Sequence, residues 1–476
     1  MKRRGAKRHT EGGTSVAPRS VRQKQHTQPK IHTPSSSTLF AALPSDLIGV
    51  IASWCCIKDV NNLLQLCTHW KTTLATKHLN LSLRYSTKSL VRAFWDSALS
   101  KHVKHLEIIQ EEKPAWIEHH YVDPRQVQLE LANYLRVIDS RVSWLTSLTL
   151  RCTPPYFQAP WCGFDFPKCL TTFSLVLPKR VIAANSDDMR RLLDIIGHAS
   201  NLTSVSFRHV AYIVELGNEL DLSPLSRLTK LTTLHLGVRM LYPAHARVIH
   251  GISTLRDVAI YRMGDEFAKE LVLLSTTKPI LWNTFSWSPD HDQVELATSI
   301  SHAVPYVTDL HLFGETRTIE YLTAFNLQLK TLKLEVAGTT INIFTAPNLL
   351  SYVSHFTHLR MLSLDNPGGA SLYRTELSSA NLAACLRKMT QLVDLRLSHM
   401  NRVDDLIFLS SCSATLENLV LQDMHVVQSK SNMNALMTLH RVTSMTLIRV
   451  FPADVTGANV ARLRSLYRLA RLCVKV

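Results

Sequence analysis

The pattern Leu-x-x-Leu-x-Leu recurs along most of the chain and limits the possible folds more than any other feature of the sequence. All three leucines are present in copies that begin at positions 145, 231, 329, 359, 392 and 416. The chain has 476 residues, of which 71 are leucine, and this composition alone predicts only about one or two such copies. The pattern is therefore an internal repeat, which indicates a stacked architecture.

Weaker copies, in which another apolar residue replaces a leucine, fill the gaps between these six. The central positions of all copies are 148, 173, 205, 234, 258, 285, 310, 332, 362, 395, 419, 445 and 472. Their mean spacing is 27 residues, which lies within the period of about 20–29 residues of repeats that contain one strand and one helix or turn. Val103, Leu106 and Ile108 fit the pattern as an additional leading strand.

The segments between the strands carry the apolar spacing of helices, as at 188–198, 293–304, 376–389 and 432–440. Short strands that alternate with helices predict a parallel sheet on the inside of a curved solenoid, with helices on the outside. The pattern resembles the leucine-rich repeats of the long, helix-containing type. The resemblance implies an α/β solenoid in the form of a leucine-rich-repeat horseshoe.

One repeat position departs from the pattern of that family. The third residue after the last leucine is usually Asn or Cys, whose side chain bonds the backbone at the turn. The residues here are Thr153, Val210, Arg239, Met263, Pro367, Met400, Met424 and Val450. The backbone amides of these turns need other partners, so we expect less uniform turns.

The residues between the leucines point away from the core, because successive side chains of a strand alternate between its two faces. They are mainly Ser and Thr in the early repeats, whereas aromatic and charged residues gather in the central ones. Centres of interfaces favour aromatic residues and Arg. We therefore predict a target-binding surface at Tyr261, His311, Phe313, Lys333, Glu335, Asp365 and Arg396. The alternative is an inner face that is merely solvated.

A small helical unit is predicted ahead of the repeats. A first helix begins near Pro44, where the missing N–H of proline costs nothing. Its apolar face is formed, at helical spacing, by Leu47, Val50, Ile51 and Trp54. Two further helices follow Asp59 and Thr68. Three short helices are close to the size below which a domain rarely folds alone. Because these helices are rich in apolar residues, we expect a partner to cover part of their surface.

The order of residues in this unit closely resembles the F-box motif, through Leu43-Pro44-x-Asp46-Leu47, Ile51, Lys58-Asp59-Val60 and Leu66-Cys67-x-x-Trp70. The resemblance implies docking on a Skp-type adaptor that is tied to a cullin scaffold. The residues implied in that contact are Leu43, Pro44, Leu47, Ile51, Leu63, Leu66 and Trp70. Trp54 and the segment 55–57 differ from the family consensus. An ordinary three-helix cap on the following domain is the alternative.

The predicted domains are a disordered basic tail over 1–38, a three-helix F-box over 39–84, a connecting or N-terminal capping segment over 85–143 and the repeats over 144–476. The tail contains nine Lys and Arg residues against one Glu, which is half of the net charge of +16. A nuclear import signal, a nucleic-acid arm and a solubilising tail all fit this composition. The tail lacks the aromatic residues on which single-stranded nucleic acids stack, so we do not expect nucleic acid as a partner.

Features of enzymes, metal proteins and membrane proteins are missing from the sequence. The longest charge-free apolar run, 47–57, has 11 residues, against the roughly 20 that a membrane-spanning helix needs. The nine cysteines form no CxxC pair and no standard zinc spacing. The common dinucleotide, nucleoside-triphosphate, hydrolase and metalloprotease motifs are absent. We expect neither catalysis nor a cofactor, no membrane contact, and a cytoplasmic or nuclear location.

The sequence therefore predicts the substrate-recognition adaptor of a cullin-based ubiquitin ligase. The repeats would hold an unknown protein target near a conjugating enzyme that carries ubiquitin. The alternatives are a non-ligase scaffold for protein–protein interaction, including a nuclear one, and a sensor whose inner surface is completed by a small molecule.

Overall fold

The structure is a computed structural model, and the residues it describes are 79–84, 103–109, 144–151, 165–176, 186–208, 220–237, 241–261, 263–288, 294–314, 325, 328–336, 347–365, 378–400, 403–424, 426, 430–450, 457–466 and 469–475. The basic tail lies outside the described residues. So do the predicted adaptor contacts Leu43, Pro44, Leu47, Ile51, Leu63, Leu66 and Trp70.

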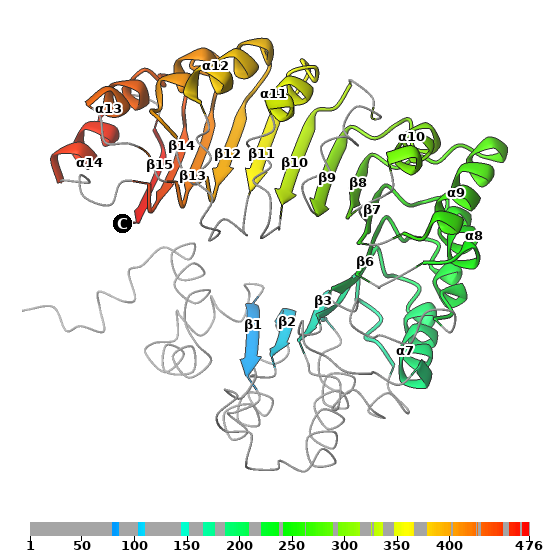
Figure 1. Ribbon diagram of the computed structural model, residues 1–476. Helices are drawn as coiled ribbons and strands as arrows, with labels where there is room; N and C mark the ends of the chain where they lie inside the picture. The colour runs from blue at the N-terminus through cyan, green and yellow to red at the C-terminus, as the bar shows by residue number, and fades with distance from the viewer. Residues whose placement is uncertain are drawn as a thin grey trace, which may run out of the picture.

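The described residues contain one 15-stranded sheet in which the strands follow one another in the order of the sequence. Every neighbouring pair is parallel. Figure 1 shows the sheet as an open arc. Its strands are β1 (Leu79–Arg84), β2 (Val103–Ile109), β3 (Ser147–Arg151), β4 (Thr172–Val176), β5 (Ser204–Arg208), β6 (Thr233–Leu236), β7 (Asp257–Ile260), β8 (Thr284–Trp287), β9 (Asp309–Gly314), β10 (Thr331–Val336), β11 (Met361–Asp365), β12 (Asp394–Ser398), β13 (Asn418–Gln422), β14 (Ser444–Ile448) and β15 (Arg471–Lys475).

Helices lie on the outer side of the arc, as Figure 1 shows. The α-helices among the described residues are α7 (Ser186–His198), α8 (Pro243–Gly251), α9 (Asp265–Thr277), α10 (Val294–Ala303), α11 (Pro347–Val353), α12 (Ser379–Lys388), α13 (Lys430–Met437) and α14 (Gly457–Arg464). In two other repeats of the described chain the outer element is a 3-10 helix: η5 (Ser223–Arg227) between β5 and β6, and η8 (Ile407–Cys412) between β12 and β13. The four helices predicted from apolar spacing are present as α7, α10, α12 and α13.

The apolar positions of the repeat form one continuous core between the sheet and the outer elements. The central leucines Leu148, Leu234 and Leu332 are each 0% exposed. Where aromatic residues replace leucine, as at Trp282 and Trp287, they are buried in the same core. Burial of these positions removes apolar surface from water, which is the main force that holds a solenoid together.

The sheet begins earlier in the chain than residue 144. The predicted leading strand at Val103–Ile109 is confirmed as β2, which pairs with β3. Leu79–Arg84, which the sequence places at the end of the helical unit, is β1 and pairs with β2. The last residues of the helical unit and the first strand of the arc are therefore the same residues.

Threonine hydroxyls link the repeats along the start of the strands. The hydroxyls of Thr171, Thr203 and Thr232 each donate to the main-chain carbonyl of the equivalent residue in the preceding repeat, at 3.1 Å. Thr146 donates in the same way to the carbonyl oxygen of Lys104, also at 3.1 Å. The carbonyl oxygens of Thr146, Thr171 and Thr203 each also accept two backbone N–H groups from the next repeat. A column of threonines thus adds side-chain hydrogen bonds to the backbone hydrogen bonds that join successive repeats.

Among the described turns that lack Asn or Cys, those after β12 and β13 have other partners for their amides. Met400, Met424 and Val450 occupy the variable position at the ends of β12, β13 and β14, and they are at most 2% exposed. The residue just before each of them has a positive φ: His399 at 56°, Asp423 at 51° and Arg449 at 51°. The amide of His399 donates to the carbonyl oxygen of Gln422, and the amide of Asp423 to that of Ile448, both at 2.8 Å.

Gly197, near the end of α7, packs against η5. A Cβ atom at this position would lie 2.6 Å from the carbonyl oxygen of Pro224 and 2.9 Å from its Cβ. Both distances are below van der Waals contact, and the carbonyl cannot yield without moving η5. We expect Gly197→Ala to lower the free energy of unfolding by about 1–3 kcal/mol, as overpacking does elsewhere. Chemical denaturation measures this change.

Gly251 at the end of α8 is the matched control, because a Cβ atom there meets nothing within 4 Å. Gly251→Ala is expected to leave the free energy of unfolding unchanged or to raise it by up to about 1 kcal/mol, since alanine favours helix. Equal effects of the two substitutions would contradict the close contact between α7 and η5.

Candidate functional site

The inner face of the arc is formed by columns of side chains that run across the strands. One column contains the middle residue of each strand, in register from β3 to β14. Its members are Thr149, Ser174, Ser206, His235, Ala259, Ser286, His311, Lys333, Ser363, Arg396, Val420 and Thr446. A second column follows the last core position of each strand, and a third precedes the central leucine. The predicted alternation of core and inner residues is seen in most strands, where the core positions are buried and the middle residue is not; β5, β7 and β8 depart from it, because Ser206, Ala259 and Ser286 are buried as well.

Two aromatic rings meet on this face although a strand lies between them. The rings of Tyr261, directly after β7, and Phe313 on β9 are stacked with centroids 4.8 Å apart and an interplanar angle of 30°. The equivalent residue after β8 is Ser288, whose small side chain leaves room for the two rings to touch. The rings of His311 and Phe313 form a T-shaped pair, with centroids 4.5 Å apart and an interplanar angle of 89°. Three of the predicted target-binding residues therefore form one aromatic platform, which we define as Tyr261, Phe313 and His311.

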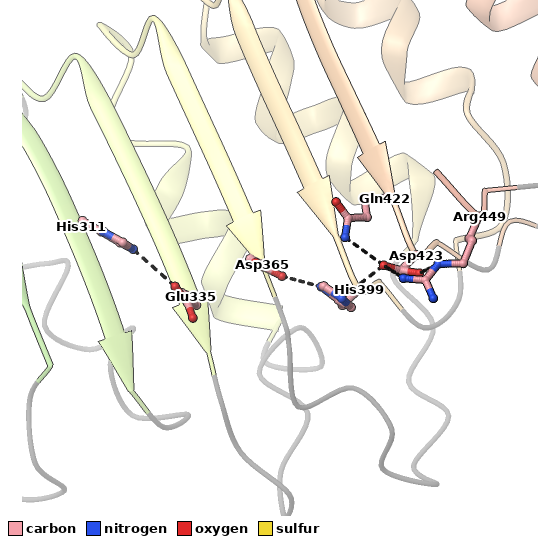
Figure 2. A network of polar contacts seen from close by, with 7 residues as sticks. All are labelled: His311, Glu335, Asp365, His399, Gln422, Asp423 and Arg449. Atoms are coloured by element: carbon pink, nitrogen blue, oxygen red, sulfur yellow. Dashed lines mark hydrogen bonds and ion pairs between the residues drawn. The ribbon is translucent and has the colours of Figure 1, made fainter. Parts of the chain in front are cut away.

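The charges beside the platform come from β10. Lys333 is the register partner of His311, and Glu335 is that of Phe313. Burial lowers the pKa of His311 to about 4, and the charge of Lys333 contributes to the lowering. His311 is therefore neutral near pH 7, and its Nε2 lies 3.8 Å from Oε2 of Glu335 as a polar contact rather than an ion pair (Figure 2).

Tyr261 lies between charges of opposite sign. Burial raises the pKa of its phenol, the negative charge of Glu335 raises it further, and the positive charge of Arg208 on β5 lowers it. The phenol therefore stays protonated near neutral pH. A protonated hydroxyl can donate a hydrogen bond as well as accept one, which adds a polar function to the aromatic platform.

A second network lies at the ends of β11–β14, as Figure 2 shows. Nδ1 of His399 lies 2.7 Å from Oδ1 of Asp365, and Nε2 of His399 lies 3.2 Å from Oδ2 of Asp423. Asp423 also accepts hydrogen bonds from Nη2 of Arg449 at 2.8 Å and from Nε2 of Gln422 at 3.0 Å. Side chains from four successive repeats are thus joined in one polar chain.

The predicted target-binding residues divide among three groups. Tyr261, His311, Phe313, Lys333 and Glu335 lie together around the aromatic platform. Asp365 belongs to the second network. Arg396 is held by Asp394 on its own strand through hydrogen bonds of 3.0 and 2.9 Å, and this carboxylate raises the pKa of its guanidinium.

Sequence reasoning missed His399, Asp423 and Arg449. Strict alternation places the second residue after the last leucine on the core side. The left-handed backbone at these three positions instead turns their side chains away from the core. A signal was present: ionisable residues recur at the same repeat position in three successive repeats, and two of them, His399 and Asp423, are of types that adopt the left-handed conformation more often than most.

Other chemistry is sparse in the described part of the chain. Burial raises the pKa of the Cys385 and Cys412 thiols to about 12, so neither is a thiolate near neutral pH. The described residues contain no group of three or more His, Cys, Asp or Glu side chains that could hold a metal ion. No helix among them is long and apolar enough to cross a bilayer.

Comparison with known proteins identifies the N-terminal unit. Residues 40–82 match the F-box family, described as "F-box domain". No curated protein matches the chain. Among solved structures 133 chains match; one belongs to the structure described as "Crystal structure of Rad7 and Elc1 complex in yeast", with a TM-score of 0.34, 11% identity and coverage of 75% of this chain and 93% of the other. The chain thus contains an F-box domain, followed by an open, all-parallel solenoid.

Proposed function

We propose that this chain is a substrate-recognition adaptor of a cullin-based ubiquitin ligase. The F-box docks on a Skp-type subunit, and the solenoid, as a leucine-rich-repeat horseshoe with parallel inner strands and outer helices, binds a protein target. The observation that carries the proposal is the F-box match at residues 40–82. The chain supplies binding, and the chemistry of transfer belongs to the conjugating enzyme, in the cytoplasm or the nucleus.

The junction between the two parts supports this role. Residues 79–82 belong both to the F-box match and to strand β1 of the sheet. Because the two parts share these residues, we infer that a target on the inner face is held at a restricted distance from the adaptor. Restricted distance raises the effective concentration of a target lysine at the conjugating enzyme.

The target surface proposed on the inner face is the aromatic platform with Lys333 and Glu335. It combines stacked rings with charges of both signs, which is the composition that binding centres favour. The outer side is covered by helices, and the edges of the sheet are far from this centre (Figure 1).

Co-expression with a Skp-type subunit tests the proposal. The wild-type chain is expected to co-purify with it, and a double variant, Leu43→Ala with Pro44→Ala, is expected to retain at least about tenfold less of the subunit, because truncated anchor residues dominate interface energies. Circular dichroism checks that the double variant keeps its helices and strands.

The matched control is Leu273→Ala on α9, where the leucine side chain is exposed on the outer side. This variant is expected to retain as much adaptor as the wild type. A wild-type chain that fails to co-purify with any Skp-type subunit would contradict the ligase function and favour a scaffold that serves another protein.

A further inference from the structure

The inner face over β7–β13 has the opposite charge to the chain as a whole. The chain carries +16 at pH 7. The inner columns of these strands hold the carboxylates Asp257, Asp309, Glu335, Asp365 and Asp394. The same columns of these strands hold two basic residues, Lys333 and Arg396, and Arg396 is paired with Asp394. His311 adds no positive charge near neutral pH, because its pKa is about 4.

Two of these carboxylates face each other across neighbouring strands. Glu335 and Asp365 are register partners on β10 and β11. Neighbouring strands lie about 4.8 Å apart, and like charges directly opposite each other are unfavourable. The side chain of Glu335 is 47% exposed and that of Asp365 is 34% exposed. Asp365 has a partner in His399, whose Nδ1 lies 2.7 Å from its Oδ1, and a basic side chain beside Glu335 would add an attraction between opposite charges at this point of the face.

The aromatic platform borders the same carboxylate. Phe313 is the register partner of Glu335 on the next strand, and Tyr261 stacks on Phe313. Guanidinium and ammonium groups are attracted to the faces of aromatic rings. Arg in addition places a planar group flat against a ring while its N–H groups reach a carboxylate. A ring stack beside an exposed carboxylate is therefore a suitable receptor for a basic side chain.

We propose that the inner face of β7–β11 binds a basic segment of the target protein, with an arginine or lysine seated between the Tyr261–Phe313 stack and the Glu335–Asp365 carboxylates. The inference rests on the proposed function, because it names the kind of target that the same surface accepts. Nucleic acid is disfavoured on this face, since its phosphates would meet the carboxylates.

The test uses the full-length chain and fluorescence anisotropy. The probe is a fluorescein-labelled peptide of Gly and Ser with Arg at alternate positions, and the reference peptide has Glu in place of each Arg. The wild-type chain is expected to bind the Arg peptide, with an affinity that falls as salt is raised, and to bind the Glu peptide at least about tenfold more weakly. Glu335→Gln and Phe313→Ala are each expected to raise the Kd for the Arg peptide by about tenfold.

The controls remove a carboxylate and an exposed apolar side chain on the outer side of the arc. Glu266→Gln removes a carboxylate of α9 whose side chain is 72% exposed, and Leu273→Ala removes an exposed apolar side chain of the same helix. Both are expected to bind the Arg peptide with the wild-type Kd. Equal binding of the two peptides, or inner-face variants that behave as these controls do, would overturn the proposal.

The basic tail of the chain is the competing occupant. A full-length variant with Lys2, Arg3, Arg4, Lys7 and Arg8 all replaced by Ser distinguishes the two cases. If the Arg peptide binds to this variant but not to the wild-type chain, the face holds the chain's own tail, and the assignment to a target segment is wrong. If the chain captures the adaptor but does not bind the peptide, this inference is overturned and the ligase function stands. If the chain binds the peptide but does not capture the adaptor, the ligase function is overturned and the basic-segment surface stands.

Discussion

Replacement of Phe285 by alanine is expected to lower the free energy of unfolding by about 3–5 kcal/mol. Phe285 on β8 is 0% exposed. Its ring centroid lies 5.8 Å from that of Trp282 and 6.4 Å from that of Trp287. Removal of the ring leaves a cavity between two indoles, and these cannot close it because each packs against the core on its other sides.

The effect is expected to concentrate in the middle of the arc, because each repeat of a solenoid contacts only its neighbours. Denaturation gives the total change, and hydrogen exchange of the β7–β9 amides locates it. Phe285→Leu is the control, since leucine occupies this position in most repeats; it is expected to cost about 1 kcal/mol. A loss below 1 kcal/mol for the alanine variant would show that this core is loosely packed.

Protonation of His311 is expected to destabilise the folded chain below about pH 6.5. Burial and Lys333 lower the pKa of this residue from 6.5 to about 4 in the folded state. The unfolded chain therefore binds a proton at a higher pH than the folded chain, and stability falls with pH across the window between the two values. His311 is expected to contribute a loss of about 2 kcal/mol between pH 7.5 and pH 5.

The contribution is measured as a difference between two chains. The free energy of unfolding of the wild type and of His311→Gln is compared at pH 7.5 and at pH 5, and the wild type is expected to lose about 2 kcal/mol more than the variant. NMR titration of the His311 ring gives its midpoint directly, with an expected value near pH 4. Identical losses for the two chains, or a ring that titrates near pH 6.5, would show that the imidazole is not desolvated.

The positions of the strands were largely predictable because the leucine spacing carries them. Leu362, Leu395 and Leu419 are spaced for strands of one sheet, and the structure pairs them as register neighbours. The helices α7, α10, α12 and α13 followed from their apolar faces. The assignment of Leu79–Arg84 to the sheet was less accessible, since a short alternating strand serves equally well as the last element of a helical unit.

The candidate site was predictable as a column of residues but not as a set of contacts. Alternation places Tyr261, Phe313 and Glu335 on one face, yet their order in the sequence does not show that Tyr261 reaches past Ser288 to stack on Phe313. The same columns do not show that Arg396 turns back to Asp394 on its own strand. Side-chain conformation and the size of each intervening residue determine these contacts, and both depend on the folded surroundings.

The sequence by itself determined most of the core positions and the columns that face away from them, because successive side chains of a strand alternate between its two faces and the apolar face is removed from water. The tertiary structure decided which inner residues touch, how far burial changes the protonation of His311, and that the left-handed backbone at 399, 423 and 449 adds a further column of charge. These properties arise between side chains of neighbouring or next-but-one repeats, and the fold sets the distances on which electrostatic and aromatic interactions depend.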